Sequence, residues 1–231
     1  MRVDTSKENK ALVELITNPS AIIFLDANFF IPPDRSDSMS GAHSISFQQY
    51  CSIWLDPLFN ELEGLSIHES VYDELVQNSV RNYADNKLNS KLGLYLDKHL
   101  SEYETVLYNT YINKLSTHSN YDPLTNCKED RGEVKSLSYM AVKGFMYFAS
   151  NDNLPARLVE HSEKLDTGLG EMTILHPYDI IFYLYKKGYE SKGLRGLYKY
   201  LYHYTTDEKR KNPCWKDFIE AMKITYKDYD F

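Results

Sequence analysis

The sequence predicts an α/β protein, a three-layer α/β/α sandwich with a central parallel sheet. Short apolar runs alternate along the chain with longer segments of helical periodicity, which is typical of βα units. The runs are apolar at consecutive positions, which indicates strands buried on both faces, as in parallel sheets. A chain of 231 residues with 42% hydrophobic content is sufficient for a packed core.

The first predicted strand is the apolar run Ala21–Leu25, which ends on Asp26. An amphipathic helix over Lys7–Thr17 precedes it. A carboxylate at the carboxyl end of a buried parallel strand emerges at the edge where open α/β sheets hold ligands. Asp26 is therefore the first candidate for chemistry, and the alternative is that it only caps the next helix.

The residues from 32 to 46 are rich in Pro, Ser, Asp and Gly and predict an exposed loop. A helix with a kink or break at Pro57 is expected over Phe47–Leu62. A short strand over Leu65–Ile67 leads into a helix whose early turns contain Glu74. An acid there also stabilises the helix dipole, so a purely structural role stays open.

The stretch Asn82–Ser119 is helical in composition and predicts two helices with a packing role. After a loop over Tyr121–Lys128, a helix is expected from Asp130 to about Gly144. Asp130 and Glu133 occupy the positions of a capping box, which offers a structural explanation for both acids.

A second apolar strand over Phe145–Ala149 delivers Asn151 and Asp152 to its carboxyl end. A helix or turn follows, and Met172–Leu175 predicts a third such strand. The domain prediction has two parts. The first is an α/β domain over 1–176, which includes an N-terminal helix over 1–20 and a helical insertion over 82–119. The second is a C-terminal helical extension over 177–231 that packs on it.

The helices of the extension are expected over Tyr178–Lys187, Leu194–Thr205 and Trp215–Tyr226. Between residues 186 and 216, nine basic and three acidic residues give a local net charge of +6. Tyrosines at 198, 200, 202 and 204 interleave with them, so this tail could hold phosphates and stack on unpaired bases. The alternatives are an ordinary solvated helix face and tyrosines that line helix interfaces. The basic candidates for substrate contact are Lys199, Lys209, Arg210 and Lys211.

The overall composition narrows the class of protein. A net charge of −7 argues against non-specific coating of nucleic acid. Three scattered cysteines without a CxxC pair argue against a disulfide framework or a zinc knuckle. The first residues lack the apolar core of a signal peptide, and no apolar run reaches the length of a bilayer. We expect a soluble, cytoplasmic protein without a membrane partner.

Acidic residues from distant segments are expected at one edge of the sheet, because parallel strands end there and the following helices begin there. A set of carboxylates repels itself unless it is neutralised, and Mg²⁺ or Mn²⁺ accepts oxygen ligands. Such an ion would polarise a phosphate and help to generate hydroxide. The candidate metal ligands are Asp26, Glu74, Asp130, Glu133 and Asp152.

Four segments carry these acids in order: IIFLDANFFIP, SIHESVYDEL, DRGEVKSLSYMAVKG and YFASNDNLPAR. Together they resemble the successive motifs of PIN-domain nucleases. The resemblance implies a parallel α/β/α sandwich and RNA cleavage dependent on Mg²⁺ or Mn²⁺, and many members of that family are toxins of toxin–antitoxin pairs. By position it implies catalytic roles for Asp26, Glu74, Glu133 and Asp152, with Asn28 and Asn151 as candidate substrate contacts.

We therefore expect a metal-dependent endoribonuclease that acts on single-stranded or looped RNA. One alternative is a catalytically inactive PIN-like regulatory or scaffolding protein that binds RNA or a protein partner. Another is a phosphohydrolase of the haloacid dehalogenase type, although Asn28 stands where that chemistry needs a second aspartate. An antitoxin or regulator partner and a homodimer are further expectations.

Overall fold

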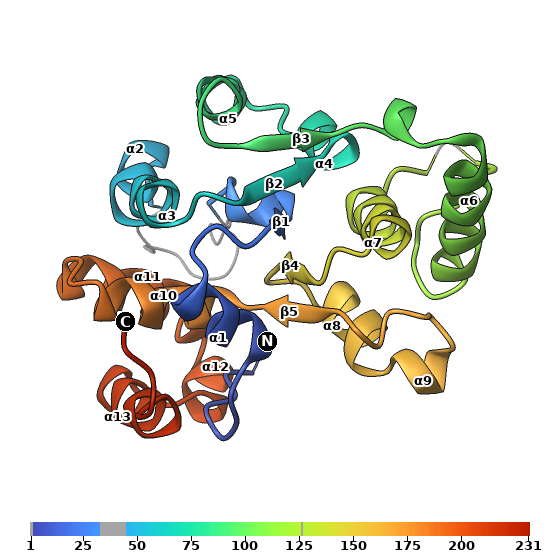
Figure 1. Cartoon of the computed structure of the whole chain (residues 1–231). Helices are drawn as coiled ribbons and strands as arrows, with labels where there is room; N and C mark the ends of the chain where they lie inside the picture. Colours follow the sequence, from blue (N-terminus) through green and yellow to red (C-terminus); the bar gives the residue numbers. More distant parts are fainter. Residues whose placement is uncertain (1, 33–44, 126) are drawn as a thin grey trace.

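The computed structural model describes residues 2–32, 45–125 and 127–231. Within these residues the centre is a five-stranded parallel sheet with the order β3-β2-β1-β4-β5 (Figure 1). The predicted α/β class with a parallel sheet is confirmed. The strands are β1 (Ile23–Leu25), β2 (Leu65–His68), β3 (Gly93–Tyr95), β4 (Tyr147–Ala149) and β5 (Thr173–Leu175).

The central strand of the sheet is β1, where Ile23 pairs with Leu65 on one side and Tyr147 on the other. The chain proceeds from β1 to β2 and β3 in one direction, then returns to place β4 on the opposite flank. The strand order therefore reverses between β1 and β4. Open α/β sheets bind ligands outside the carboxyl ends of strands at such a reversal.

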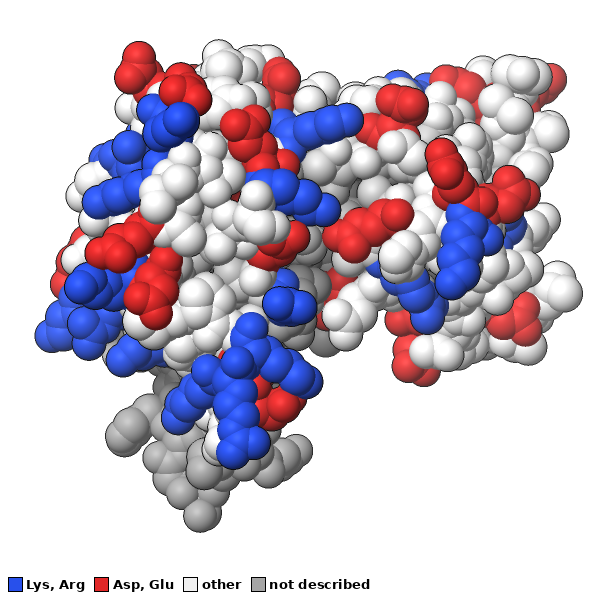
Figure 2. Space-filling view, turned by 90° about the horizontal axis from the view of Figure 1, so that it is seen from below, with Lys and Arg blue, Asp and Glu red and all other residues white. Residues whose placement is uncertain are grey.

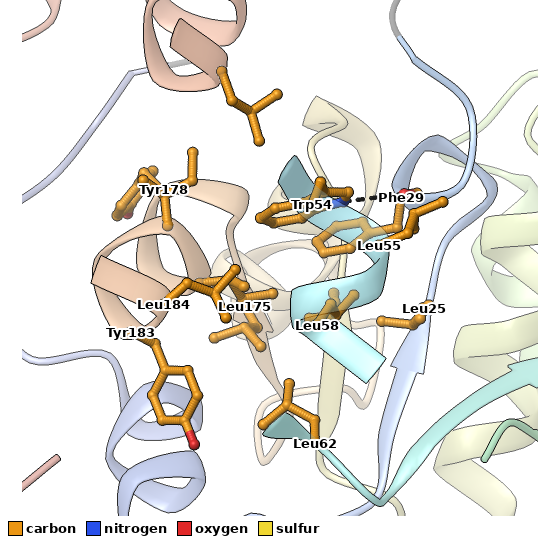
Figure 3. Close-up of a cluster of buried hydrophobic side chains, with 14 of the residues drawn as sticks. Leu25, Phe29, Trp54, Leu55, Leu58, Leu62, Leu175, Tyr178, Tyr183 and Leu184 are labelled. Carbon is orange, nitrogen blue, oxygen red and sulfur yellow. Dashed lines mark hydrogen bonds between the residues drawn. The ribbon is translucent and has the colours of Figure 1, made fainter. Parts of the chain in front are cut away.

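One face of the sheet is covered by a layer that contains both ends of the chain. The layer includes α1 (Lys10–Thr17), α3 (Asp56–Glu61), α5 (Asn78–Leu88), α10 (Pro177–Lys186), α11 (Ser191–Tyr202) and α13 (Trp215–Thr225). Leu25, Leu58 and Leu184 lie in this core (Figure 3). The helices α10, α11 and α13, which follow residue 176, thus share one hydrophobic core with the first strand.

The opposite face is covered by α6 (Glu102–Ser116), α7 (Arg131–Lys143) and α8 (Asn153–Glu160). Phe24 and Phe148 point from the sheet into this second core, where they meet Leu137 of α7 and Leu158 of α8. Helices thus flank the sheet on both sides, as in a three-layer sandwich (Figure 1).

The prediction of an all-helical stretch over 82–119 is wrong, because β3 lies within it. Leu94 of β3 pairs with Ile67 of β2, so the stretch supplies an edge strand between α5 and α6. Three residues are too few to show a period, and Gly93 is a poor strand former.

Two other helical predictions are refined. The helix around Pro57 consists of α2 (Phe47–Tyr50), a π-helical turn η3 (Cys51–Leu55) and α3. The irregularity precedes the proline, and the N–H of Asp56 donates five residues back to Cys51. In the tail, α11 ends at Tyr202 and a separate helix α12 (Thr206–Lys211) follows. The expected loop over 32–46 lies largely outside the described residues.

The remaining helices are α4 (Glu69–Glu74) and α9 (Ser162–Leu165). No helix in the described part of the chain combines the length and apolar character needed to span a membrane.

Candidate metal centre

Three carboxylates meet outside the ends of β1 and β4. Asp26 directly follows β1, Asp152 precedes α8, and Glu133 lies in the first turn of α7. One oxygen of each side chain lies within 4.8 Å of those of the other two. The structure thus brings together three of the five predicted acids at the reversal of strand order.

Asp26 is 2% exposed and is held by neutral donors. Its Oδ1 accepts a hydrogen bond from the N–H of Ala27 at 2.7 Å, which caps the short 3₁₀ turn η1 (Ala27–Phe29). Its Oδ2 accepts from Ser150 Oγ at 2.7 Å and from Asn28 Nδ2 at 2.8 Å. The capping alternative is therefore correct for Oδ1, whereas Oδ2 shares the Asn28 amide with Asp152 Oδ2.

Asn28 and Ser150 tie the two aspartates together. Asn28 Nδ2 also donates to Asp152 Oδ2 at 2.9 Å, and the N–H of Asp152 donates to Ser150 Oγ at 3.0 Å. Ser150 is fully buried and was not singled out from the sequence. The signal for it is its place between β4 and Asp152, in the triplet SND.

The electrostatics of the cluster are unfavourable without a cation. Burial raises the pKa of Asp26 well above its ordinary value, and the charges of Glu133 and Asp152 raise it further. Burial also raises the pKa of Glu133 to about 7, with Glu74 and Asp152 contributing. Within the described ranges, no lysine or arginine forms an ion pair with any of the three clustered acids.

The donor set fits a hard divalent cation. The three carboxylates offer only oxygen ligands, which Mg²⁺ and Mn²⁺ prefer. In addition, Asn28 Oδ1 is buried and has no hydrogen-bond partner among the described residues. A buried oxygen without a hydrogen-bond partner lowers stability unless a water molecule or an ion contacts it. A cation bound between Asp26, Glu133 and Asp152 would neutralise the charges of these carboxylates.

Glu74 lies next to this cluster but is not one of the three that meet. The backbone N–H of Gly132 donates to its carboxylate, and burial raises its pKa. A Cβ on Gly132 would lie only 2.6 Å from Glu74 Oε1, so a larger residue there would displace the Glu74 carboxylate. Glu74 therefore fixes the start of α7, the turn that carries Glu133.

The predicted capping box at the start of α7 is wrong. Asp130 has a left-handed backbone with φ 58° and makes no side-chain cap. Its Oδ2 instead accepts from the N–H of Asn120 at 2.8 Å. Aspartate tolerates this conformation better than most residues, and the turn leaves the carboxylate of Glu133 free to face Asp26.

The remaining predicted substrate contacts lie at different places. Asn151 is half-buried, and its Oδ1 accepts from Tyr202 Oη of α11 at 3.3 Å. The four predicted basic contacts, Lys199, Lys209, Arg210 and Lys211, are exposed. Figure 2 views the molecule from the side of α12 and α13, where basic side chains are interspersed with acidic ones.

The prediction that the tail tyrosines stack on bases is wrong for three of them. Tyr198, Tyr200 and Tyr202 are at most 9% exposed. Tyr198 stacks on Phe218 of α13 with ring centroids 4.5 Å apart. These rings line helix interfaces, as the alternative proposed.

Comparison with known protein families, curated proteins and solved structures yields no match to this chain. Its function is therefore inferred from the residues of the site.

Proposed function

We propose that the protein is a metal-dependent ribonuclease with Mg²⁺ or Mn²⁺ held by Asp26, Glu133 and Asp152. The observation that carries the proposal is a group of converging carboxylates at the strand-order reversal that no cation of the described chain neutralises. Its four acidic segments resemble those of PIN-domain nucleases, which supports RNA as the substrate. The same resemblance supports a toxin-like role with a protein antitoxin.

A bound divalent ion would polarise the phosphate and lower the pKa of a coordinated water. The chain's own residues hold and orient its ligands. Ser150 and Asn28 fix the oxygens of Asp26 and Asp152, so that little reorganisation is needed when the ion arrives. Glu74 positions the turn that carries Glu133 through the N–H of Gly132. A metal at this place also explains how an acidic protein can act on a polyanion.

The test is cleavage of single-stranded RNA, structured RNA and single-stranded DNA, each with Mn²⁺ and with a chelator. Wild-type protein should cleave RNA only with the metal. Asp26→Asn should lower the rate about a thousandfold, since a metal contributes several kcal/mol to the transition state. The matched control is Asp166→Asn, which removes an exposed carboxylate. The backbone of Asp166 is left-handed, a conformation that asparagine also tolerates, so this variant should fold and retain full activity.

A folded Asp26→Asn protein that cleaves RNA undiminished would contradict the proposal. RNA binding without Mn²⁺ binding would favour the alternative of an inactive regulatory or scaffolding protein.

A further inference from the structure

A pocket of about 520 Å³ opens beside Glu74, next to the metal centre. We call it the arginine pocket, and its lining residues are Asp73, Glu74, Val76, Arg81, Lys128 and Arg131. It adjoins the cluster directly, because Arg131 precedes the Gly132–Glu133 turn and Glu74 binds the N–H of Gly132. Of the three cations that line the pocket, Arg131 lies in the same first turn of α7 as Glu133, one of the uncompensated acids.

Arg131 has hydrogen-bonding capacity that the described residues do not use. Its Nε is buried without a hydrogen-bond partner among them. One terminal nitrogen lies 3.6 Å from Asp73 Oδ2, which is longer than a hydrogen bond. A guanidinium fork matches the geometry of a phosphate, and the Arg131 side chain, which lines the pocket, is 22% exposed.

Arg81 and Lys128 extend this positive surface. The Arg81 guanidinium lies 3.4 Å from the centre of the Tyr72 ring and donates to the Tyr72 carbonyl at 2.6 Å, so its orientation is fixed. Lys128 is exposed. Val76 is 79% exposed and offers an apolar contact to a ribose or base.

Resting on the proposed function, we propose that the arginine pocket binds a backbone phosphate of single-stranded RNA beside the scissile bond. Arg131 and Lys128 are the principal contacts. The RNA then lies in the groove between α4 and the start of α7. The exposed basic residues of α11 and α12 are not its main contacts. RNA is a polyanion and is repelled by the group of carboxylates that it must approach. The cations of the arginine pocket would offset this repulsion beside the metal centre.

The test is the salt dependence of RNA binding in the presence of EDTA, where cleavage plays no part. The probe is a short fluorescent single-stranded RNA of mixed sequence, followed by anisotropy with the full chain. A phosphate contact on single strands contributes about 0.7 to the slope of log Kd against log salt concentration. Arg131→Gln and Lys128→Gln should each lower the slope by about this amount and weaken binding about tenfold.

Lys227→Gln, which removes an exposed lysine after α13, is the control and should leave the slope unchanged. Lys128 is exposed, so its variant keeps the test valid even if Arg131→Gln does not fold. An unchanged slope in folded Lys128→Gln, or a loss of slope only in Lys209→Gln and Arg210→Gln, would overturn the proposal. RNA that binds with the predicted slopes but is never cleaved in Mn²⁺ would support the pocket and refute the ribonuclease.

Discussion

Two aspartates at the same edge of the sheet have opposite surroundings. Asp97 follows β3, and its carboxylate lies 2.9 Å from His68 Nε2 and 2.7 Å from Lys135 Nζ. Asp26 follows β1 and receives hydrogen bonds only from neutral groups in the described part of the chain. The chain thus neutralises the carboxylate of Asp97 on one half of the edge, whereas the carboxylate of Asp26 at the strand-order reversal has no cationic partner among the described residues.

The pKa directions express this difference. Burial acts to raise the pKa of Asp97, but hydrogen bonds from His68 and Lys135 hold it well below its ordinary value. Burial raises the pKa of Asp26 and Glu133 instead. Ionised Asp97 therefore stabilises the fold above its unfolded pKa of 3.8, and this contribution is lost as the pH falls. Glu133 in the metal-free protein has the opposite effect, since its ionisation costs stability as the pH rises from 4.5 to about 7.

The largest effect on stability is expected for Asp97→Asn. The substitution removes the charge that Lys135 and His68 bind, and charge-assisted hydrogen bonds contribute about 1.5–3 kcal/mol each. We expect the free energy of unfolding to fall by about 2–3 kcal/mol near neutral pH, measured by urea denaturation. A loss below about 0.5 kcal/mol is typical of surface substitutions. Such a result would show that the partners of Asp97 do not stabilise its charge, and that Asp97 does not differ from Asp26 in this respect.

A smaller effect of opposite sign is expected for Glu133→Gln. Removing one of the repelling charges should raise the free energy of unfolding of the metal-free protein by about 1–2 kcal/mol at about pH 8. The gain should shrink steadily below about pH 7 and vanish at about pH 4, because Glu133 is then protonated in both the folded and the unfolded state. Urea denaturation in EDTA at about pH 8 and about pH 4 measures this. Equal effects at the two pH values would contradict the electrostatic account of the cluster.

The smallest effect is expected for Lys211→Gln. Its ammonium lies 2.5 Å from Asp207 Oδ2, but both side chains are more than 60% exposed. Solvated pairs of this kind contribute about 0.3–0.5 kcal/mol, and salt screens them. We expect a change of at most about 0.5 kcal/mol in urea denaturation. A loss as large as that of Asp97→Asn would mean that a short ion-pair distance matters more than burial.

Much of the sheet could be predicted from the sequence because four of its strands lie within or beside buried apolar runs. The strand β3 could not, since its half-buried residues Gly93–Tyr95 give no such run. The role of the tail tyrosines stayed open because tyrosines interleaved with basic residues are compatible with a nucleic-acid surface and with a helix interface. In α11, however, Tyr198 and Tyr202 are one turn apart and face the core, whereas Lys199 faces solvent.

The site was predictable where a residue follows an apolar strand. Asp26 and Asp152 were identified by that rule, and Glu133 by its place at a helix start. Ser150 also follows an apolar strand, but its hydrogen bond to Asp26, a residue far away in sequence, could not be read from that position. Gly132 lacked any such signal, because its importance depends on its contact with Glu74. The role of Asp130 was misjudged because a left-handed residue cannot be distinguished from an N-cap by spacing alone.

The most direct test of the metal centre is anomalous diffraction from crystals soaked in Mn²⁺. We predict an anomalous peak for manganese within coordination distance of carboxylate oxygens of Asp26 and Asp152. The peak should be absent from Asp26→Asn crystals. A site without manganese at saturating concentration, with these carboxylates paired to lysine or arginine, would contradict it.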